Sequence, residues 1–282
     1  MMTALRQQMI GAMRQRGFSI RTHQSYLSAV RDLARYYRRS PDQLGREELQ
    51  GFFNHLAQER NLSGATCRLY LNGIRFLYLQ VLKRPSFEVE LIVPKRAQRI
   101  PELLTRQEVR RILDACTQPK HRMMLETVYG CGLRLSEVVK LKVRDIDGER
   151  ARLRIEQGKG AKDRLVILSP GLLHALRRYW SDHRPPLWLF PNAYHADRPL
   201  GVATVQKAFT RAKLRSGVNK VGGIHSLRHA YATHQLEHGL PVHELQRLLG
   251  HGNLQSTLRY VHWLPGHGDG PRAHADLIGD RS

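Results

Sequence analysis

The chain is poor in cysteine, in long apolar runs and in acidic side chains, and each shortage argues against certain classes of protein. Its 282 residues include only three widely spaced cysteines, Cys67, Cys116 and Cys131. An odd number without a paired motif argues against a disulfide framework and a structural zinc site. We therefore expect three buried thiols in a reducing compartment. No apolar run approaches the length of a membrane span, and the N-terminus lacks the apolar block of a secretion signal, so we expect a cytoplasmic protein that does not bind membranes.

Acidic side chains are outnumbered nearly two to one. The sequence holds 46 Lys and Arg against 24 Asp and Glu, which gives a net charge of +22. The first hundred residues carry 17 basic and 7 acidic side chains, and the remainder carries 29 and 17. Because the excess extends over both halves, a polyanion that touches both explains it best, and DNA or RNA is the obvious candidate. A basic protein that is merely soluble is the alternative.

The first part of the chain has helical periodicity only, with segments predicted at 3–16, 22–38, 46–58 and 64–82. The predicted buried stripes are Tyr26, Leu27, Val30, Leu33, Ala34 and Tyr37 in the second helix and Leu69, Leu71, Ile74, Leu77, Tyr78 and Val81 in the fourth. Arginines occupy the opposite faces. Such arginines are usually only solvated, but an all-helical unit rich in them is also typical of a clamp on the phosphate backbone.

A basic linker is predicted at 95–101, where Pro94 and Pro101 flank the cations and disfavour a helix. Thr105 and Glu108 then form a capping box that starts a new helix, with Leu104 placed to contact Val109. We therefore expect a helical domain over 1–94 and a second domain over 102–264. Residues 265–282, rich in Gly, His and Asp, are expected to be weakly structured.

The second domain is predicted to be mixed. Residues 151–156 and 163–168 alternate apolar and polar side chains around the turn Gly158-Lys159-Gly160, which predicts a β-hairpin. Gly130-Cys131-Gly132 is expected to turn the chain into a helix that begins near Leu135. The other helices are predicted at 105–116, 120–130, 171–182, 201–214, 226–238, 241–249 and 253–262. The fold class is therefore mainly α with a small antiparallel β-sheet.

Six polar residues in this domain are candidates for chemistry, although each alone has an ordinary structural explanation. Arginines and histidines are common on helix surfaces, a lysine at a hairpin tip is usually solvated, and a tyrosine in a short helix is usually part of the core. The six are Arg134, Lys159, His225, Arg228, His251 and Tyr260.

Together these residues supply what phosphoryl transfer to a hydroxyl group requires. Arg134 and Arg228 can offer forked donors to the non-bridging oxygens of a phosphodiester. Histidines can add hydrogen bonds and move protons near neutral pH. A phenol with a pKa of about 10 needs a base and cationic surroundings to act as a nucleophile, and a lysine on a hairpin tip can protonate the leaving oxygen.

The order of these residues resembles the signature boxes of the tyrosine recombinases, the family of phage and transposon integrases and Xer-type enzymes. The matching segments are Gly132-Leu133-Arg134-Leu135-Ser136-Glu137, Gly158-Lys159-Gly160, His225-Ser226-Leu227-Arg228-His229, Leu248-Leu249-Gly250-His251 and Tyr260. The resemblance implies a two-domain, C-shaped clamp on double-stranded DNA, a 3′-phosphotyrosine intermediate with a free 5′-hydroxyl, and four protomers assembled on two sites. It implies no cofactor, neither ATP nor a metal ion.

The resemblance transfers the six roles box by box, with Tyr260 as the nucleophile. Lys162 is the rival for the lysine role because it lies on the same turn. The rivals for the nucleophile are Tyr231, Tyr194 and Tyr129, none of which has the nine-residue step from His251. The short separation of Arg134 from His225 favours the integrase or Xer type over integron integrases. The tail after Trp263 shows no convincing amphipathic helix, so its exchange between protomers would rest on Ala273 to Ile278.

Two other functions compete with this interpretation. A zinc site is suggested by four closely spaced histidines, although no cysteine or carboxylate partner stands out: His225, His229, His234 and His238. A non-catalytic DNA-binding accessory factor would fit the charge equally well, but it has no need of Tyr260 or Lys159. Candidates for further DNA contacts are Arg211, Lys213, Arg215 and Lys220.

Overall fold

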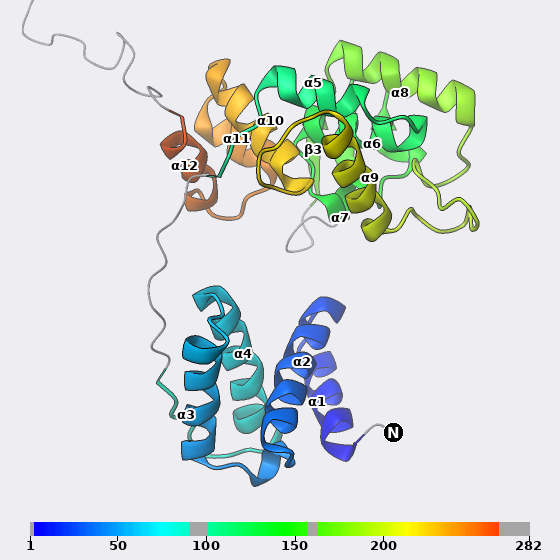
Figure 1. The fold of residues 1–282 in the computed structure, drawn as a ribbon. Coiled ribbons are helices and arrows are strands. Elements are labelled where there is room, and N and C mark those ends of the chain that lie inside the picture. The colour runs from blue at the N-terminus through cyan, green and yellow to red at the C-terminus, as the bar shows by residue number, and fades with distance from the viewer. Residues whose placement is uncertain (1–2, 91–100, 157–162, 265–282) are drawn as a thin grey trace, which may run out of the picture. The chain divides into compact units, whose positions relative to one another are not determined.

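The computed structural model of the chain describes residues 3–90, 101–156 and 163–264 (Figure 1). The chain divides into two compact units, an N-terminal unit, Met1–Arg99, and a C-terminal unit, Ile100–Ser282. Most of the expected linker, the hairpin tip with Lys159 and Lys162, and the tail after Leu264 lie outside the described residues. No described helix is both long enough and apolar enough to cross a membrane.

The described part of the N-terminal unit is helical, as predicted. Serine side chains cap two of the helices: Ser19 accepts a hydrogen bond from the Thr22 amide and Ser63 from the Thr66 amide. The third and fourth helices each continue into a π-helical turn, so the two long predicted segments are single continuous rods. The elements are α1 (Ala4–Gln15), α2 (Ile20–Tyr37), a 3-10 turn (Pro41–Gln43), α3 (Arg46–Asn54) with its π-turn (His55–Glu59), and α4 (Gly64–Phe76) with its π-turn (Leu77–Val81).

The core of this unit is apolar and aromatic, with Leu33, Phe53 and Ile74 fully buried. The predicted stripes are mostly confirmed as core or as half-buried residues packed against it. The prediction for Leu69 is wrong, because its side chain is 39% exposed. Leu69 precedes Ile74 by five residues, which turns it by about 140° around a helix of 3.6 residues per turn, away from the buried face.

The C-terminal unit is mainly helical around a small antiparallel sheet, which confirms the predicted fold class. The sheet has the order β1-β2-β3, with Leu153 opposite Val166 in the predicted hairpin. The short first strand was not predicted. The strands are β1 (Ile146–Asp147), β2 (Arg152–Ile155) and β3 (Arg164–Ile167). The helices are α5 (Arg106–Asp114), α6 (Pro119–Cys131), α7 (Leu135–Val138), α8 (Pro170–His183), α9 (Val202–Arg215), α10 (His225–Glu237), α11 (Val242–Leu249) and α12 (Gln255–His262), with a 3-10 turn at Val143–Asp145.

The predicted start of this unit is confirmed. Thr105 Oγ1 accepts from the Glu108 amide and the Glu108 carboxylate accepts from the Thr105 amide, which completes the capping box. Leu104 and Val109 are both buried in the main core. A second, smaller apolar cluster is formed by α10, α11 and α12, which pack together at one end of the unit (Figure 1) and include Tyr260. All three cysteines are buried.

Candidate active site

The turn that carries Arg134 depends on a glycine. Helix α6 ends at Cys131, and Gly132 follows in the left-handed conformation with φ +59°. A Cβ atom at this position would lie 2.3 Å from the Tyr231 ring, so only glycine fits there. Gly130 lies within the helix, which corrects the prediction that the whole Gly130–Gly132 segment forms the turn. Arg134 then sits at the N-cap of α7.

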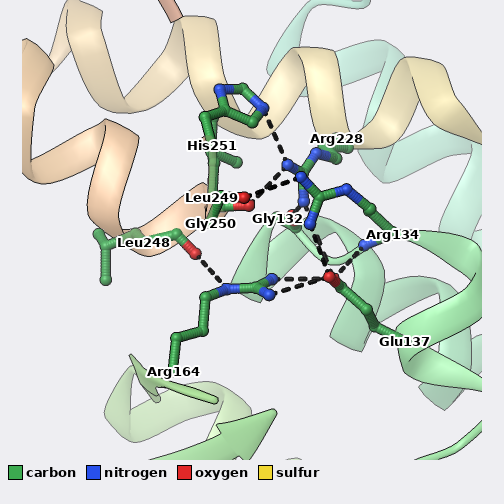
Figure 2. A network of polar contacts seen from close by, with 9 residues as sticks. All are labelled: Gly132, Arg134, Glu137, Arg164, Arg228, Leu248, Leu249, Gly250 and His251. Atoms are coloured by element: carbon green, nitrogen blue, oxygen red, sulfur yellow. Dashed lines mark hydrogen bonds and ion pairs between the residues drawn. The ribbon is translucent and has the colours of Figure 1, made fainter. Parts of the chain in front are cut away.

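A buried carboxylate, Glu137, accepts hydrogen bonds from two arginines and lies 3.9 Å from a third, Arg228 (Figure 2). Arg134 Nη1 donates to Glu137 Oε1 at 2.7 Å, and the Arg134 amide donates to Oε2 at 2.8 Å. Arg164, at the start of β3, forms a fork with both oxygens at 2.9 and 2.8 Å. Burial alone would raise the pKa of Glu137, but the hydrogen bonds and charge of Arg164, with help from Arg134, outweigh it and lower that pKa to about 2. The carboxylate is therefore ionised and fixes both guanidinium groups.

Three successive carbonyls at the C-terminal end of α11 each accept a hydrogen bond from a different arginine (Figure 2). Leu248 O accepts from Arg164 at 2.9 Å, Leu249 O from Arg228 at 2.7 Å and Gly250 O from Arg134 at 3.0 Å. The last carbonyls of a helix have no partner within it and carry the negative end of its dipole. The arginines therefore supply hydrogen bonds to the free carbonyls of this helix end, and the carbonyls in turn orient the guanidinium groups.

Arg228 is the most enclosed charge of the site, with 1% of its side chain exposed. Besides Leu249 O it donates to Gly132 O at 2.6 Å and lies 3.0 Å from His251 Nε2. Burial, and then the nearby charge of Arg134, lower the pKa of Arg228 to about 10, so the guanidinium remains charged at neutral pH.

His251 follows the α11 cap at Gly250, where φ is +63°. Its Nε2 faces Arg228 Nη2, and its Nδ1 lies 2.8 Å from Thr257 Oγ1. Because a guanidinium can only donate, Nε2 must accept and the ring must be neutral, with its proton on Nδ1. Burial, and then the charge of Arg228, lower the pKa of His251 to about 3, which agrees with this tautomer.

Tyr260 lies on α12 with 2% of its surface exposed. Its hydroxyl is 3.1 Å from His229 Nδ1, its ring stacks on His251 at a centroid distance of 6.2 Å, and Trp263 packs edge-on at 5.2 Å. Burial raises the pKa of Tyr260, and the charges of Arg228 and Arg259 oppose that shift. The phenol is therefore protonated at neutral pH in this arrangement.

His229 and His225 complete the group of rings. His225 is the first residue of α10, is exposed, and lies edge-on to His229 with 4.6 Å between ring centroids. Burial and then the charge of His225 lower the pKa of His229 to about 4. Five of the six predicted residues are thus connected by hydrogen bonds or ring contacts, either directly or through one neighbouring residue. These five are Arg134, Arg228, His225, His251 and Tyr260. The sixth, Lys159, lies outside the described residues.

The rival tyrosines have other surroundings. Tyr231 packs its ring over Gly132, Tyr129 bonds His234 Nδ1 at 2.9 Å, and Tyr194 is 91% exposed. Within the described residues no group of three or more His, Cys, Asp or Glu is arranged to hold a metal ion. The histidines of the suggested zinc site instead have separate partners, since His229 bonds Tyr260 and His234 bonds Tyr129.

Three of the four basic residues suggested as DNA contacts have hydrogen-bond partners inside the unit. Lys213 Nζ donates to Lys220 O and to Gly222 O, and Lys220 Nζ contacts both Glu108, at 2.6 Å, and Leu103 O. Arg215 donates to Thr117 Oγ1 at 3.1 Å. The lysines therefore tie the 216–224 loop to α9 and α5.

The sequence analysis did not identify Glu137, Arg164 and His229 as site residues. Glu137 stood inside a quoted motif without a role, and His229 was considered only as a possible zinc ligand. Arg164 carried a signal of its own: it shares the inward side of its strand with Val166 and Leu168, both buried. A charged residue at an inward position of a strand indicates a buried partner.

Comparison with known proteins identifies the family. The model of the phage integrase family matches residues 102–267, and that of the phage integrase N-terminal SAM-like domain matches residues 5–88. A putative integrase/recombinase, y4qK, of Sinorhizobium fredii is 42% identical over 92% of this chain and 84% of its own length. The tyrosine recombinase XerD of Oceanobacillus iheyensis is 30% identical over 88% of this chain and 89% of its own.

Solved structures show the same fold. The Tn1549 transposon integrase, solved in complex with a circular intermediate DNA, superposes with a TM-score of 0.71 over 92% of this chain and 95% of that one, at 18% identity. The family models match segments of both units, and relatives at 30–42% identity extend over most of the sequence. The chain therefore belongs to the phage integrase family, the tyrosine recombinases, which carry out site-specific DNA recombination.

Proposed function

We propose that this recombinase breaks and rejoins double-stranded DNA through a 3′-phosphotyrosine bond to Tyr260. The observation that carries the proposal is the convergence of Arg134, Arg228, His251 and Tyr260 at the C-terminal end of α11 and the adjoining helices. A protonated phenol, two fixed guanidinium groups and neutral imidazoles together suit the transfer of a phosphoryl group to a hydroxyl.

The two arginines would bind the scissile phosphate. A guanidinium has five N–H donors, and the contacts of Arg228 with Gly132, Leu249 and His251 use three of them. The remaining donors can bind non-bridging oxygens. Glu137 and the α11 carbonyls hold both guanidinium groups in place before DNA arrives, so little reorganisation is needed when charge builds up in the transition state.

Proton transfer would involve the remaining candidates. The leaving 5′-oxygen needs a proton, which we assign to Lys159. His225 lies at the exposed edge of the site, where it can contact a bound phosphate. His251, with both ring nitrogens engaged, would orient Arg228. Because the phosphotyrosine conserves the energy of the broken bond, no ATP is required, and Arg134 and Arg228 would supply the positive charge that a divalent metal supplies in other enzymes.

We propose that residues 1–94 form a DNA-binding core-binding domain, 95–101 a basic linker and 102–264 the catalytic domain; the expected tail, 265–282, lies outside the described residues. The net charge of +22 and its spread over both halves support a clamp on DNA. The structurally similar Tn1549 transposon integrase was solved in complexes with DNA. Homo-oligomerisation on DNA, as a tetramer at synapsis, would bring two sites together.

The test is a suicide DNA substrate, nicked so that cleavage traps the covalent adduct, once a target site has been mapped from DNA flanking the gene. The wild type should give a denaturant-resistant protein–DNA adduct in the presence of EDTA. Tyr260→Phe should bind the same DNA and give no adduct, since the phenyl ring has no nucleophile. An adduct formed by Tyr260→Phe, or cleavage abolished by EDTA, would overturn the proposal. A non-catalytic accessory factor, the alternative function, predicts DNA binding without an adduct in the wild type.

A further inference from the structure

We propose that His229 accepts the phenolic proton when Tyr260 attacks the phosphate. None of the six roles assigned above from the family resemblance belongs to His229. The proposal rests on the proposed nucleophilic role of Tyr260. It is carried by the 3.1 Å contact between Tyr260 Oη and His229 Nδ1, the one hydrogen bond between the phenol and a histidine in the described part of the chain.

The other two histidines of the site are less suited to this task. His251 Nε2 is occupied by Arg228 and its Nδ1 by Thr257, so it could take a proton only by releasing Arg228. His225 lies beyond His229, edge-on to its ring and exposed. His229 is therefore the histidine whose ring nitrogen faces the nucleophile.

The rings around His229 fix its orientation. It packs against His225 from its own helix, and against Tyr260 and Trp263 of the α12 segment with centroid distances of 5.6 and 5.3 Å. In the proposed arrangement the phenol donates and Nδ1 accepts, which places the proton of the neutral ring on Nε2. Neutral His229 thus holds Tyr260 with its hydroxyl hydrogen directed at a base.

The charges around His229 explain how bound substrate would increase the affinity of its ring for a proton. The groups that act on it are His225, Arg228 and Arg259, and together with burial they disfavour a second proton on the ring. A phosphodiester bound between Arg134 and Arg228 would neutralise part of that positive charge, and the transition state carries still more negative charge. Protonation of His229 then becomes favourable at the moment when Tyr260 loses its proton.

The step balances as follows. The Tyr260 O–H bond breaks and its proton moves to His229 Nδ1, which becomes imidazolium, while the Tyr260 oxygen forms a bond to phosphorus. The bond from phosphorus to the 5′-oxygen breaks, and that oxygen takes a proton from the separate acid assigned above to Lys159. Religation reverses each transfer, and His229 returns the proton to the phenol.

Two substitutions separate proton transfer from positioning. His229→Asn places an amide oxygen near the position of Nδ1 and can still accept a hydrogen bond from Tyr260, but it cannot become protonated near neutral pH. His229→Phe keeps a ring and removes the bond. If His229 is the base, both variants should lose adduct formation by about 100-fold or more, as expected for general-base catalysis. If it only positions Tyr260, His229→Asn should cleave at close to the wild-type rate, which would overturn the proposal.

A matched control is available on the same helix. His234 is buried and also bonds a tyrosine, Tyr129, at 2.9 Å, but outside the arginine cluster. His234→Asn should leave the cleavage rate within about twofold of the wild type, whereas an equal loss in both variants would contradict a specific role for His229.

A substrate with sulfur in place of the 5′-bridging oxygen sharpens the test, because a thiolate leaves without a proton. A Lys159→Ala variant should be rescued by this substrate and His229→Asn should stay slow; rescue of His229→Asn would contradict its role toward the nucleophile.

If the His229 variants do not fold, ¹⁵N-histidine spectra of the wild type and of Tyr260→Phe can replace them. An unchanged His229 Nδ1 resonance would overturn the contact itself. An adduct in Tyr260→Phe overturns the proposed function, whereas its absence together with a fast His229→Asn overturns this inference alone.

Discussion

The two units of the chain differ most in what they bury. Every buried polar or charged side chain among the described residues belongs to the C-terminal unit: Thr127, Glu137, Asp145, Arg228, Thr233, His234 and Thr257. The N-terminal unit buries aliphatic and aromatic side chains, and its many arginines lie on the surface or beside it. One unit is stabilised almost entirely by apolar packing, and the other also encloses an ionic network.

This difference separates the side chains that stabilise the fold from those that also supply chemical groups. An enclosed guanidinium or carboxylate loses its hydration, so it is tolerated only where partners replace the water. The Arg134–Glu137–Arg164 network and the three α11 carbonyls supply those partners (Figure 2). The same contacts that make these charges tolerable also orient them toward Tyr260 and the proposed phosphate position. In the N-terminal unit the exposed arginines keep their hydration and need no such support.

Of the two substitutions, the larger effect on stability is expected from Glu137→Gln, which breaks the ionic network at its centre. Glu137→Gln removes the negative charge shared by Arg134 and Arg164 and leaves two partly enclosed guanidinium groups without it. Loss of one partner of a buried ion pair typically costs about 3–5 kcal/mol. Urea unfolding followed by tryptophan fluorescence measures this in the intact chain, because Trp180, Trp188 and Trp263 all lie in the C-terminal unit. A cost below about 1 kcal/mol would show that the network is not a buried one.

A matched cavity in the N-terminal unit should leave the site intact. Leu33 is fully buried, and Leu33→Ala should destabilise that unit by about 2–5 kcal/mol through lost burial and a cavity. The far-UV circular dichroism transition should move to lower urea while the tryptophan transition stays in place. A tryptophan transition that moves equally would show that the two units unfold together.

Acid should also act on the C-terminal unit. The folded-state pKa values of His229 and His251, about 4 and about 3, lie below the ordinary value of 6.5. The unfolded chain therefore binds more protons in this range, and the stability that neutral rings contribute is complete above pH 6.5 and is lost as pH falls toward 4. Glu137 adds to this loss only at lower pH, from its ordinary value of 4.5 toward about 2.

The tryptophan-monitored urea midpoint should consequently fall between pH 6.5 and pH 4. His251→Asn should reduce this dependence, because one of the two titrating rings is removed. A midpoint that stays constant over this range in the wild type would contradict the burial of both neutral rings.

Much of the local structure could be predicted because its signals lie within a few residues of each other. The capping box of Thr105 and Glu108 starts α5 as expected, Gly250 ends α11, and the alternation around residues 151–168 gives the hairpin. The predicted helices agree with the described ones to within a few residues, apart from α7, which is a single turn. Five of the six predicted site residues also lie together in the structure. They could be identified in advance because the motifs that contain them are short and occur in a fixed order.

The sequence by itself determined the helices, the hairpin, the basic surface and the identity of the chemical groups. Only the tertiary structure decided which partner each group has. Arg164 meets Glu137 across 27 residues, and Arg228 meets Gly132 O across 96. Every residue carries a carbonyl, so no sequence pattern marks the three at the end of α11 that accept from arginines. Likewise, the Tyr260 hydroxyl bonds His229 because α10 and α12 pack together, and periodicity along one helix cannot specify a contact between two.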